Sequence, residues 1–161
     1  YVGKPMMKIL NNFKIFNLHG FTLIELFVVI FIIGIISVIV FPALRFYQPT
    51  LELSNSAQEL IGDLRYVQQM AVTEQTKYGI NFLILEKKYQ LIKYGQTEEV
   101  IQTKELPEKV NFDSISGLTD NKVKFNPYGA SEETGTVTLI NTKNVTKTID
   151  IRPSGFVKII N

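Results

Sequence analysis

The chain has 161 residues, of which 45% are hydrophobic and 20% charged, and its formal net charge is +2. This length suits one modest domain with an appendage. The absence of cysteine excludes a disulfide framework, a thiolate metal site and a cysteine nucleophile. Three of the 17 basic residues precede Gly20, which leaves 14 basic side chains against 15 acidic ones from Phe21 onward. This balance argues against a large nucleic-acid surface.

The first 20 residues form a short basic segment without an acid. They contain Lys4, Lys8 and Lys14, and either Met6 or Met7 could be the biological start. His19, the only histidine in the sequence, directly precedes Gly20. We interpret residues 1–20 as a leader that is removed on maturation.

Residues 21–41 are apolar apart from Thr22, Glu25 and Ser37. About 20 apolar residues are enough to span the hydrocarbon core of a bilayer as a helix. The lysines cluster before this segment, which predicts an N-terminus in the cytoplasm and the rest of the chain outside the membrane. No A-x-A-like cleavage site follows Val40, so we expect the helix to be retained.

Glu25 is unusual because a carboxylate in a spanning helix is costly without a function or a partner. One explanation is an interfacial position in the first helical turn, where the helix dipole favours negative charge. A second explanation is cleavage between Gly20 and Phe21, which would create an ammonium four residues from the carboxylate. The partner amine could belong to the same helix or to a neighbouring subunit, where pairing would select one axial register.

Residues 42–75 predict an amphipathic continuation of the same helix. Pro42 and Pro49 each remove one helical hydrogen bond, and we expect them to bend the helix rather than end it. Apolar residues then recur at spacings of three and four and form one stripe. The stripe consists of Leu53, Ala57, Leu60, Leu64, Val67 and Ala71.

Residues 76–161 change to short alternating runs separated by turn formers, which is typical of antiparallel sheet. In the first run, Tyr78, Ile80, Phe82 and Ile84 are predicted to share a face. The expected class is therefore α+β, with a long N-terminal helix packed on a small antiparallel β-sheet domain.

The run GFTLIE, followed by an apolar helix, resembles the processing motif of type IV prepilins and of the pseudopilins of type II secretion. The resemblance implies that a prepilin peptidase and methyltransferase cleaves after Gly20 and methylates Phe21. It also implies that Glu25 guides assembly and processing, and that Pro42 is the helix-kinking proline. No catalytic, cofactor-binding or metal-binding residue is implied.

The rest of the chain is similar to the minor pseudopilin H and FimT-like minor pilin group. The matching positions are Phe125, Pro127, Gly129, Gly135 and Gly155, and their turn chemistry has an equally good structural explanation. The resemblance implies assembly with other pilins or pseudopilins on an inner-membrane assembly platform. We therefore expect a single-pass protein of the bacterial inner membrane that then enters a pilus or pseudopilus.

The sequence leaves two alternative functions open. A DNA-binding minor pilin of an uptake system would use Lys143, Lys147, Arg152 and Lys158, although lysines on strands are usually a solvated face. An uncleaved signal anchor would explain the apolar run and its basic flank, but it gives no reason for Gly20, Phe21 and Glu25 to occur together.

An enzyme is difficult to build from these residues, because the only histidine would leave with the leader. One predicted turn contains Ser131, Glu132 and Glu133, whose oxygen atoms could bind a calcium ion. Calcium requires several oxygen ligands, however, and this short stretch has no loop pattern that supplies them. We therefore expect a solvated acidic turn and a structural protein.

Overall fold

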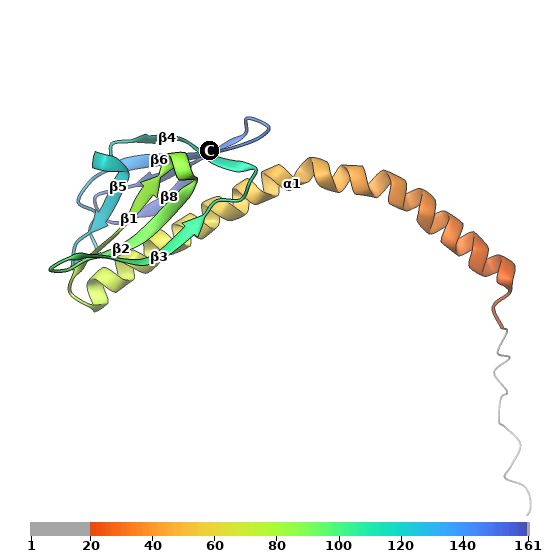
Figure 1. The fold of residues 1–161 in the computed structure, drawn as a ribbon, viewed down its shortest axis with the longest axis horizontal. Coiled ribbons are helices and arrows are strands. Elements are labelled where there is room, and N and C mark those ends of the chain that lie inside the picture. The colour runs from red at the N-terminus through yellow and green to blue at the C-terminus, as the bar shows by residue number, and fades with distance from the viewer. Residues whose placement is uncertain (1–19, 161) are drawn as a thin grey trace, which may run out of the picture. The chain divides into compact units, whose positions relative to one another are not determined.

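The computed structural model describes residues 20–160. The predicted leader, including Met6, Met7 and His19, lies outside the described residues. The chain divides into two compact units, one up to Phe41 and one from Pro42 onward. The helix α1, Leu23–Thr73, belongs to both units (Figure 1).

Helix α1 is 51 residues long and contains both Pro42 and Pro49. The prediction that neither proline ends the helix is confirmed. Its stretch Leu23–Pro42 is long and apolar enough to cross a membrane, and none of that stretch is buried within the chain. These apolar side chains can therefore be shielded from water only by lipid or by another protein.

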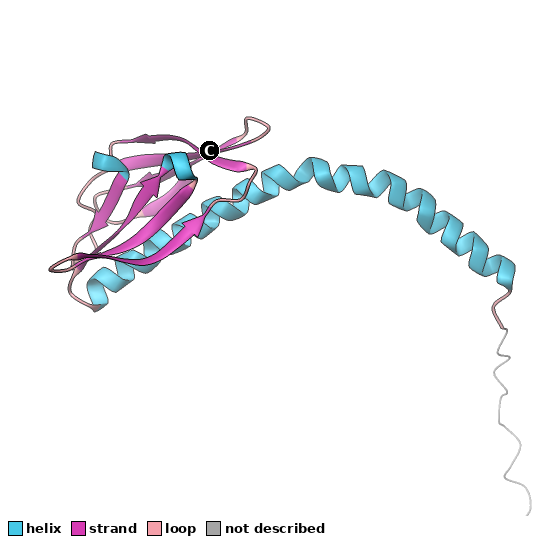
Figure 2. Cartoon of the chain, viewed as in Figure 1, coloured by secondary structure: helices cyan, strands magenta, loops and turns pink. Residues whose placement is uncertain are grey.

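The remaining described chain forms eight strands and two short 3₁₀ helices (Figure 2). The antiparallel α+β class is confirmed, and the strands are divided between two four-stranded sheets rather than joined in one. The first sheet has the order β3-β2-β1-β5, with β1 Lys77–Leu83, β2 Lys88–Tyr94, β3 Glu98–Glu105 and β5 Lys122–Phe125. The second has the order β4-β6-β7-β8, with β4 Val110–Ser116, β6 Gly135–Asn141, β7 Thr146–Ile151 and β8 Val157–Ile160.

The first strand ends earlier than its alternation suggests. Ile84 belongs to the 3₁₀ helix η1, Ile84–Glu86, rather than to β1. Lys87 follows in the left-handed conformation with φ 55°, and the chain reverses there into β2. The second 3₁₀ helix, η2, spans Thr119–Asn121 directly before β5. Ile84 still packs against the core, although it is only partly buried.

One hydrophobic core joins α1 to both sheets. All six residues of the predicted helical stripe are fully buried, which confirms the periodicity argument. Phe82 of the first sheet meets Phe112 of the second in a T-shaped contact with ring centroids 5.7 Å apart. The other large buried side chains come from strands of both sheets, and they include Tyr78, Tyr89, Leu91, Phe125, Leu139, Ile149 and Ile151.

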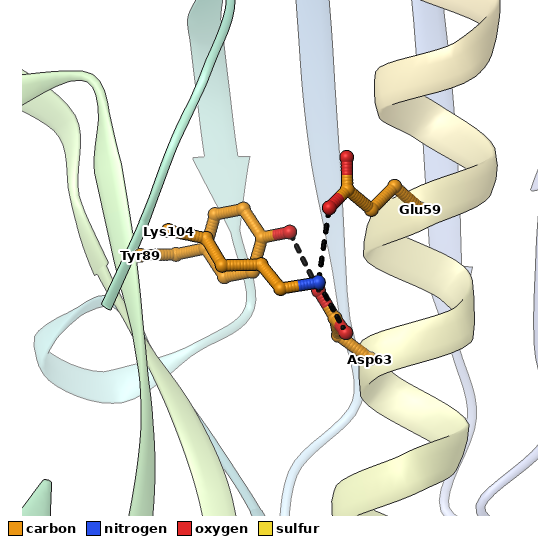
Figure 3. Close-up of polar contacts among 4 residues, drawn as sticks. All are labelled: Glu59, Asp63, Tyr89 and Lys104. Carbon is orange, nitrogen blue, oxygen red and sulfur yellow. Dashed lines mark hydrogen bonds and ion pairs between the residues drawn. The ribbon is translucent and has the colours of Figure 1, made fainter. Parts of the chain in front are cut away.

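A polar cluster ties α1 to β2 and β3 beside this core (Figure 3). The Tyr89 hydroxyl donates a 2.6 Å hydrogen bond to Asp63, and the Lys104 ammonium lies 2.9 Å from both Asp63 and Glu59. Asp63 is mostly buried, with 13% of its side chain exposed, so it needs both partners. Burial and the bond to Asp63 raise the pKa of the Tyr89 phenol.

Replacing Lys104 with Ala should lower the free energy of unfolding by about 1 to 2 kcal/mol, because Asp63 would keep a charge with one partner fewer. Urea unfolding of a fragment covering residues 42–161 measures this loss. Lys88→Ala is the matched control, since the carboxylate that Lys88 pairs with, Glu105, is 69% exposed. Equal effects of the two substitutions would contradict a special role for the cluster.

The raised pKa of Tyr89 predicts a loss of stability above pH 10. An unfolded tyrosine ionises near pH 10, whereas the folded phenol stays protonated, so stability is complete below pH 10 and declines above it. This one group should contribute a decline of about 1.4 kcal/mol per pH unit.

The Tyr89→Phe variant provides the comparison, because it keeps the ring and removes the ionising group. It should be less stable than the wild type at pH 7, and the gap should shrink as the pH rises beyond 10. Unfolding midpoints from pH 7 to pH 11 measure the gap. A gap that stays constant would contradict the argument.

Candidate processing and assembly site

Gly20 and Phe21 form an open junction before α1. Both residues precede the first helical residue, Leu23, and Phe21 is 84% exposed. Among the described residues beyond its immediate neighbour Phe21, no atom lies within 4 Å of the place where a Gly20 side chain would begin. Within the described chain, the peptide bond between Gly20 and Phe21 is therefore unobstructed.

Thr22 and Glu25 close the start of α1 through reciprocal hydrogen bonds. The Glu25 amide donates to Thr22 Oγ1 at 3.3 Å, and the Thr22 amide donates to Glu25 Oε2 at 2.9 Å. The Thr22 hydroxyl also donates to Glu25 Oε2 at 2.9 Å. This is a capping box, in which the two side chains satisfy backbone donors that have no partner inside the helix.

The rest of the membrane-length stretch has few polar groups. The Ser37 hydroxyl donates to the carbonyl of Ile33 at 2.7 Å, so its polar group is satisfied within the helix. Pro42 ends the stretch and has no amide hydrogen to donate to the carbonyl of Val38. Glu25 is thus the only ionisable residue between Gly20 and Pro42.

The two turns that contain Gly129 and Gly155 meet on α1. Gly129 and Gly155 have φ values of +82° and +76°, a region that favours glycine. A side chain on Gly155 would overlap the carbonyl oxygen of Gly129 and the amide of Gln68. Gln68 itself donates to the Gly129 carbonyl at 2.7 Å. These glycines therefore have a packing role.

The acidic turn considered for calcium is engaged by other groups. Glu132 pairs with Lys77 at 2.6 Å, and Glu133 accepts a 2.6 Å hydrogen bond from the Thr119 amide. That bond lowers the pKa of the Glu133 carboxyl. Ser131 donates to the Glu133 carbonyl at 2.7 Å. Among residues 20–160, no group of three acidic or histidine side chains is arranged to hold a metal ion.

The four basic residues near the C-terminus are not gathered on one face. Lys147 pairs across the sheet with Leu139, whose side chain is buried, whereas Lys158 pairs with Asp150. Residues 147 and 150 point to opposite faces of β7, because side chains alternate along a strand. Arg152 is paired with Asp150 at 3.0 Å, and Lys143 donates to the Phe46 carbonyl of α1.

Two family models match this chain. The model described as Type II transport protein GspH matches residues 56–155, and the prokaryotic N-terminal methylation motif matches residues 16–41. The chain belongs to the GspH family. The predicted relationship to minor pseudopilins and minor pilins is therefore confirmed. A comparison with curated protein sequences gave no match.

Solved structures share the fold at low identity. The minor pseudopilin EpsH of the Vibrio cholerae type 2 secretion system is 12% identical, with a TM-score of 0.59 over 68% of this chain and 96% of that one. The type IV minor pilin FimU of Pseudomonas aeruginosa is 14% identical, with a TM-score of 0.56 over 72% of this chain and 92% of that one. One is described as a minor pseudopilin and the other as a minor pilin, and their structural similarity shows a pilin-like α+β fold.

Thr22 is the one residue of this site that the sequence reasoning missed. In the sequence it stands out only as a polar exception in an apolar run. The spacing of Thr22 and Glu25 matches the S/T-x-x-E pattern of a capping box, and this signal could have identified the pair.

Replacing Thr22 with Ala should loosen the first turn of α1. The Glu25 amide would lose its acceptor, so its hydrogen exchange should become about fivefold faster. Nuclear magnetic resonance of the full chain in detergent micelles measures the exchange. Thr22→Ser keeps the hydroxyl and should leave the rate unchanged, whereas unchanged exchange in the Ala variant would contradict the cap.

Proposed function

We propose that this chain is the precursor of a minor pilin or pseudopilin that is processed at Gly20 and assembles through α1. In this proposal residues 1–20 are the leader, 21–41 the membrane and assembly segment, 42–75 the amphipathic continuation and 76–161 the extracytoplasmic domain. The observation that carries the proposal is an apolar stretch, Leu23–Pro42, that none of the described residues bury and that begins two residues after an open Gly20–Phe21 bond. The match to the methylation motif supports the same bond as the processing site.

Processing would be performed by a prepilin peptidase and methyltransferase at the membrane face. Cleavage after Gly20 would release the basic leader and leave a free amine on Phe21, which the same enzyme would methylate. The non-helical conformation of this junction supports the step, because a protease needs an extended peptide that is free of neighbouring atoms. The lysines of the leader favour a cytoplasmic N-terminus before cleavage.

In the mature subunit, Glu25 would cap the start of α1 and would also pair with an amine. Both bonds from Thr22 reach the same oxygen, Oε2, so the other oxygen is available for a further donor. A methylated ammonium on Phe21, of the same or a neighbouring helix, is a suitable donor because a charged pair in a poor dielectric is strongly attracted. The cap would thus hold the carboxylate in place for pairing during assembly.

The apolar side chains of α1 would first meet lipid and then other subunits. Neighbouring pilin-like helices offer a similar apolar environment, so the segment can leave the bilayer without exposure to water. The soluble domain would remain on the extracytoplasmic side. The role would be structural, which agrees with the minor pseudopilin and the minor pilin that share its fold.

The first experiment is co-expression of the full chain with a prepilin peptidase, followed by mass spectrometry of the product. We expect a mature N-terminus at a methylated Phe21. The matched control is Gly20→Val, which places a branched side chain next to the scissile bond and should leave the precursor intact. An intact wild-type chain, where a control prepilin is cut, would contradict the proposal and favour a signal anchor.

Substitutions at Glu25 separate its charge from its capping role. Glu25→Gln keeps an oxygen acceptor for Thr22 but cannot neutralise an amine, and Glu25→Ala removes both functions. We expect both variants to be cleaved and to enter filaments at least about tenfold less than the wild type, because a buried ammonium without a partner is costly.

The fraction of mature subunit in sheared filaments, relative to the membrane fraction, measures this incorporation. The control is Thr22→Ser, which should assemble normally. Normal assembly of Glu25→Gln would show that the cap alone matters and would refute the charge-pairing step.

A further inference from the structure

A short apolar face of α1 continues beyond the membrane-length stretch and stays exposed. It consists of Leu44, Tyr47 and Leu51, of which 62%, 64% and 61% are exposed. Residues 44, 47 and 51 are three and four positions apart, so they lie on one side of the helix. The next residues on this side are polar and uncharged, namely Ser54, Asn55 and Gln58. The apolar face therefore ends at Leu51.

The soluble domain is attached to the opposite side of this segment. Pro49 and Leu53 are buried, and Pro49 lies opposite Tyr47 because two positions along an α-helix correspond to a turn of about 200°. Lys143, in the turn between β6 and β7, donates to the carbonyl of Phe46, and its ammonium lies 3.0 Å from the centre of the Phe46 ring. These contacts hold the segment to the domain and leave the apolar face turned away from it.

The acidic residues that follow on α1 are paired with lysines of the soluble domain. Glu52 lies 3.5 Å from the ammonium of Lys109, directly before β4, and Glu59 lies 2.9 Å from the ammonium of Lys104 in β3. Both carboxylates are thus engaged on the side of the helix that meets the sheets. Neither of them lies on the apolar face, because each is about 100° away from it around the helix.

Arg45 and Tyr47 have the chemistry of a membrane interface. Arg45 is exposed and is the only charged residue from Pro42 to Leu51. Among residues 20–160, no carboxylate forms an ion pair with Arg45. A guanidinium can bond two oxygens of one phosphate, which suits a phospholipid headgroup. Tyrosine is enriched at the membrane–water boundary, because its ring is apolar and its hydroxyl is polar.

The length of the apolar face fits a helix that passes obliquely through the headgroup region. At 1.5 Å per residue, Leu44 and Leu51 lie about 3 and about 14 Å beyond Pro42. The headgroup region on each side of a bilayer is only about 5 to 7 Å thick. A perpendicular helix would therefore carry Leu51 into water, whereas an oblique one keeps the whole face shielded. Pro42 permits the change of direction, because it removes one helical hydrogen bond.

We propose that residues 44–51, which we call the interfacial segment, bind the extracytoplasmic surface of a phospholipid bilayer. This inference rests on the proposed function, because it requires the stretch Leu23–Pro42 to span the membrane. Leu44, Tyr47 and Leu51 enter the boundary between headgroups and acyl chains, and Arg45 bonds a lipid phosphate. The soluble domain is then held on the side of the interfacial segment that faces away from the lipid.

A lipid surface fits the interfacial segment better than a second copy of the chain does. The apolar face continues directly from a stretch that is itself long and apolar enough to cross a membrane. A specific protein interface buries about 800 Å² on each partner, which is more than three side chains can supply. The border of a bilayer has no such minimum area, because its apolar and polar layers extend along the whole surface.

Tryptophan fluorescence of the full chain in vesicles tests the proposal, since the sequence contains no tryptophan. One reporter is Tyr47→Trp, and a second is Ile32→Trp near the centre of Leu23–Pro42. The matched controls are Tyr66→Trp, later on α1, and Tyr128→Trp, which replaces a side chain that is 90% exposed. The vesicles contain phosphatidylethanolamine and phosphatidylglycerol whose acyl chains carry bromine, a quencher, either near the headgroup or near the chain end.

We expect bromine near the headgroup to reduce the emission from position 47 at least about twofold, and bromine near the chain end to reduce it less. The reporter at position 32 should show the reverse order. The reporters at positions 66 and 128 should be quenched by neither lipid.

Substitutions combined with Tyr47→Trp identify the side chains that hold the interfacial segment. Leu51→Gln should reduce the quenching about twofold, because it removes apolar area from the face. Arg45→Glu should reduce it similarly, because a carboxylate is repelled by lipid phosphates. Arg45→Lys and the control Leu85→Gln, at a position 99% exposed on η1, should leave the quenching unchanged. Equal circular dichroism spectra establish that the variants are folded.

Four results would overturn the interfacial segment and leave the proposed function intact, if the reporter at position 32 is quenched as expected. They are no quenching at position 47, stronger quenching there by bromine near the chain end, emission that changes with the ratio of protein to lipid, and quenching unaffected by both Leu51→Gln and Arg45→Glu. The third result would indicate a second copy of the chain as the partner. An unquenched reporter at position 32 would overturn the proposed membrane segment, and this inference with it.

Discussion

The apolar surface of α1 imposes the constraint on which the rest of the molecule depends. From Leu23 to Pro42 the helix is apolar on every side apart from Glu25 and Ser37, and none of it is buried by the described residues. From Leu53 to Ala71, in contrast, its apolar residues form a single stripe that the chain itself buries. Hydrophobic burial is the main driving force for both segments. The first segment can be buried only in lipid or against other subunits, whereas the second is buried against the two sheets.

Polar contacts set the position of the sheets on the helix. Asp63 accepts hydrogen bonds from Lys104 and Tyr89, and Glu59 accepts one from Lys104. Directly after α1, a second cluster joins Glu74 to Lys93 and Tyr78. The bond to Lys93 and that to Tyr78 lower the pKa of the Glu74 carboxyl. Hydrophobic contacts are non-directional, so these pairs fix which part of the first sheet lies over which turn of α1.

The start of α1 meets a structural requirement with two residues, Thr22 and Glu25, and in the function that we propose Glu25 also serves assembly. A helix that begins at a membrane face leaves its first amides without partners, and Thr22 and Glu25 satisfy them reciprocally. The capping role explains why a carboxylate is tolerated at this point even before an amine is generated at Phe21. Glu25 is therefore useful to the precursor as well as to the mature subunit that we propose.

The amino-acid sequence by itself determined the features that depend on neighbouring residues. Local periodicity predicts the membrane-length stretch, the buried stripe from Leu53 to Ala71 and the alternating runs of residues 76–161, and fixed spacing predicts the motif from Gly20 to Glu25. Only the tertiary structure decided the division into two sheets, the pairing of Lys104 with Asp63, the separation of Lys147 from Lys158 and the meeting of the two turns at Gln68. The physical reason is that these contacts join segments tens of residues apart, and their partners are selected by the shape of the shared core rather than by any local pattern.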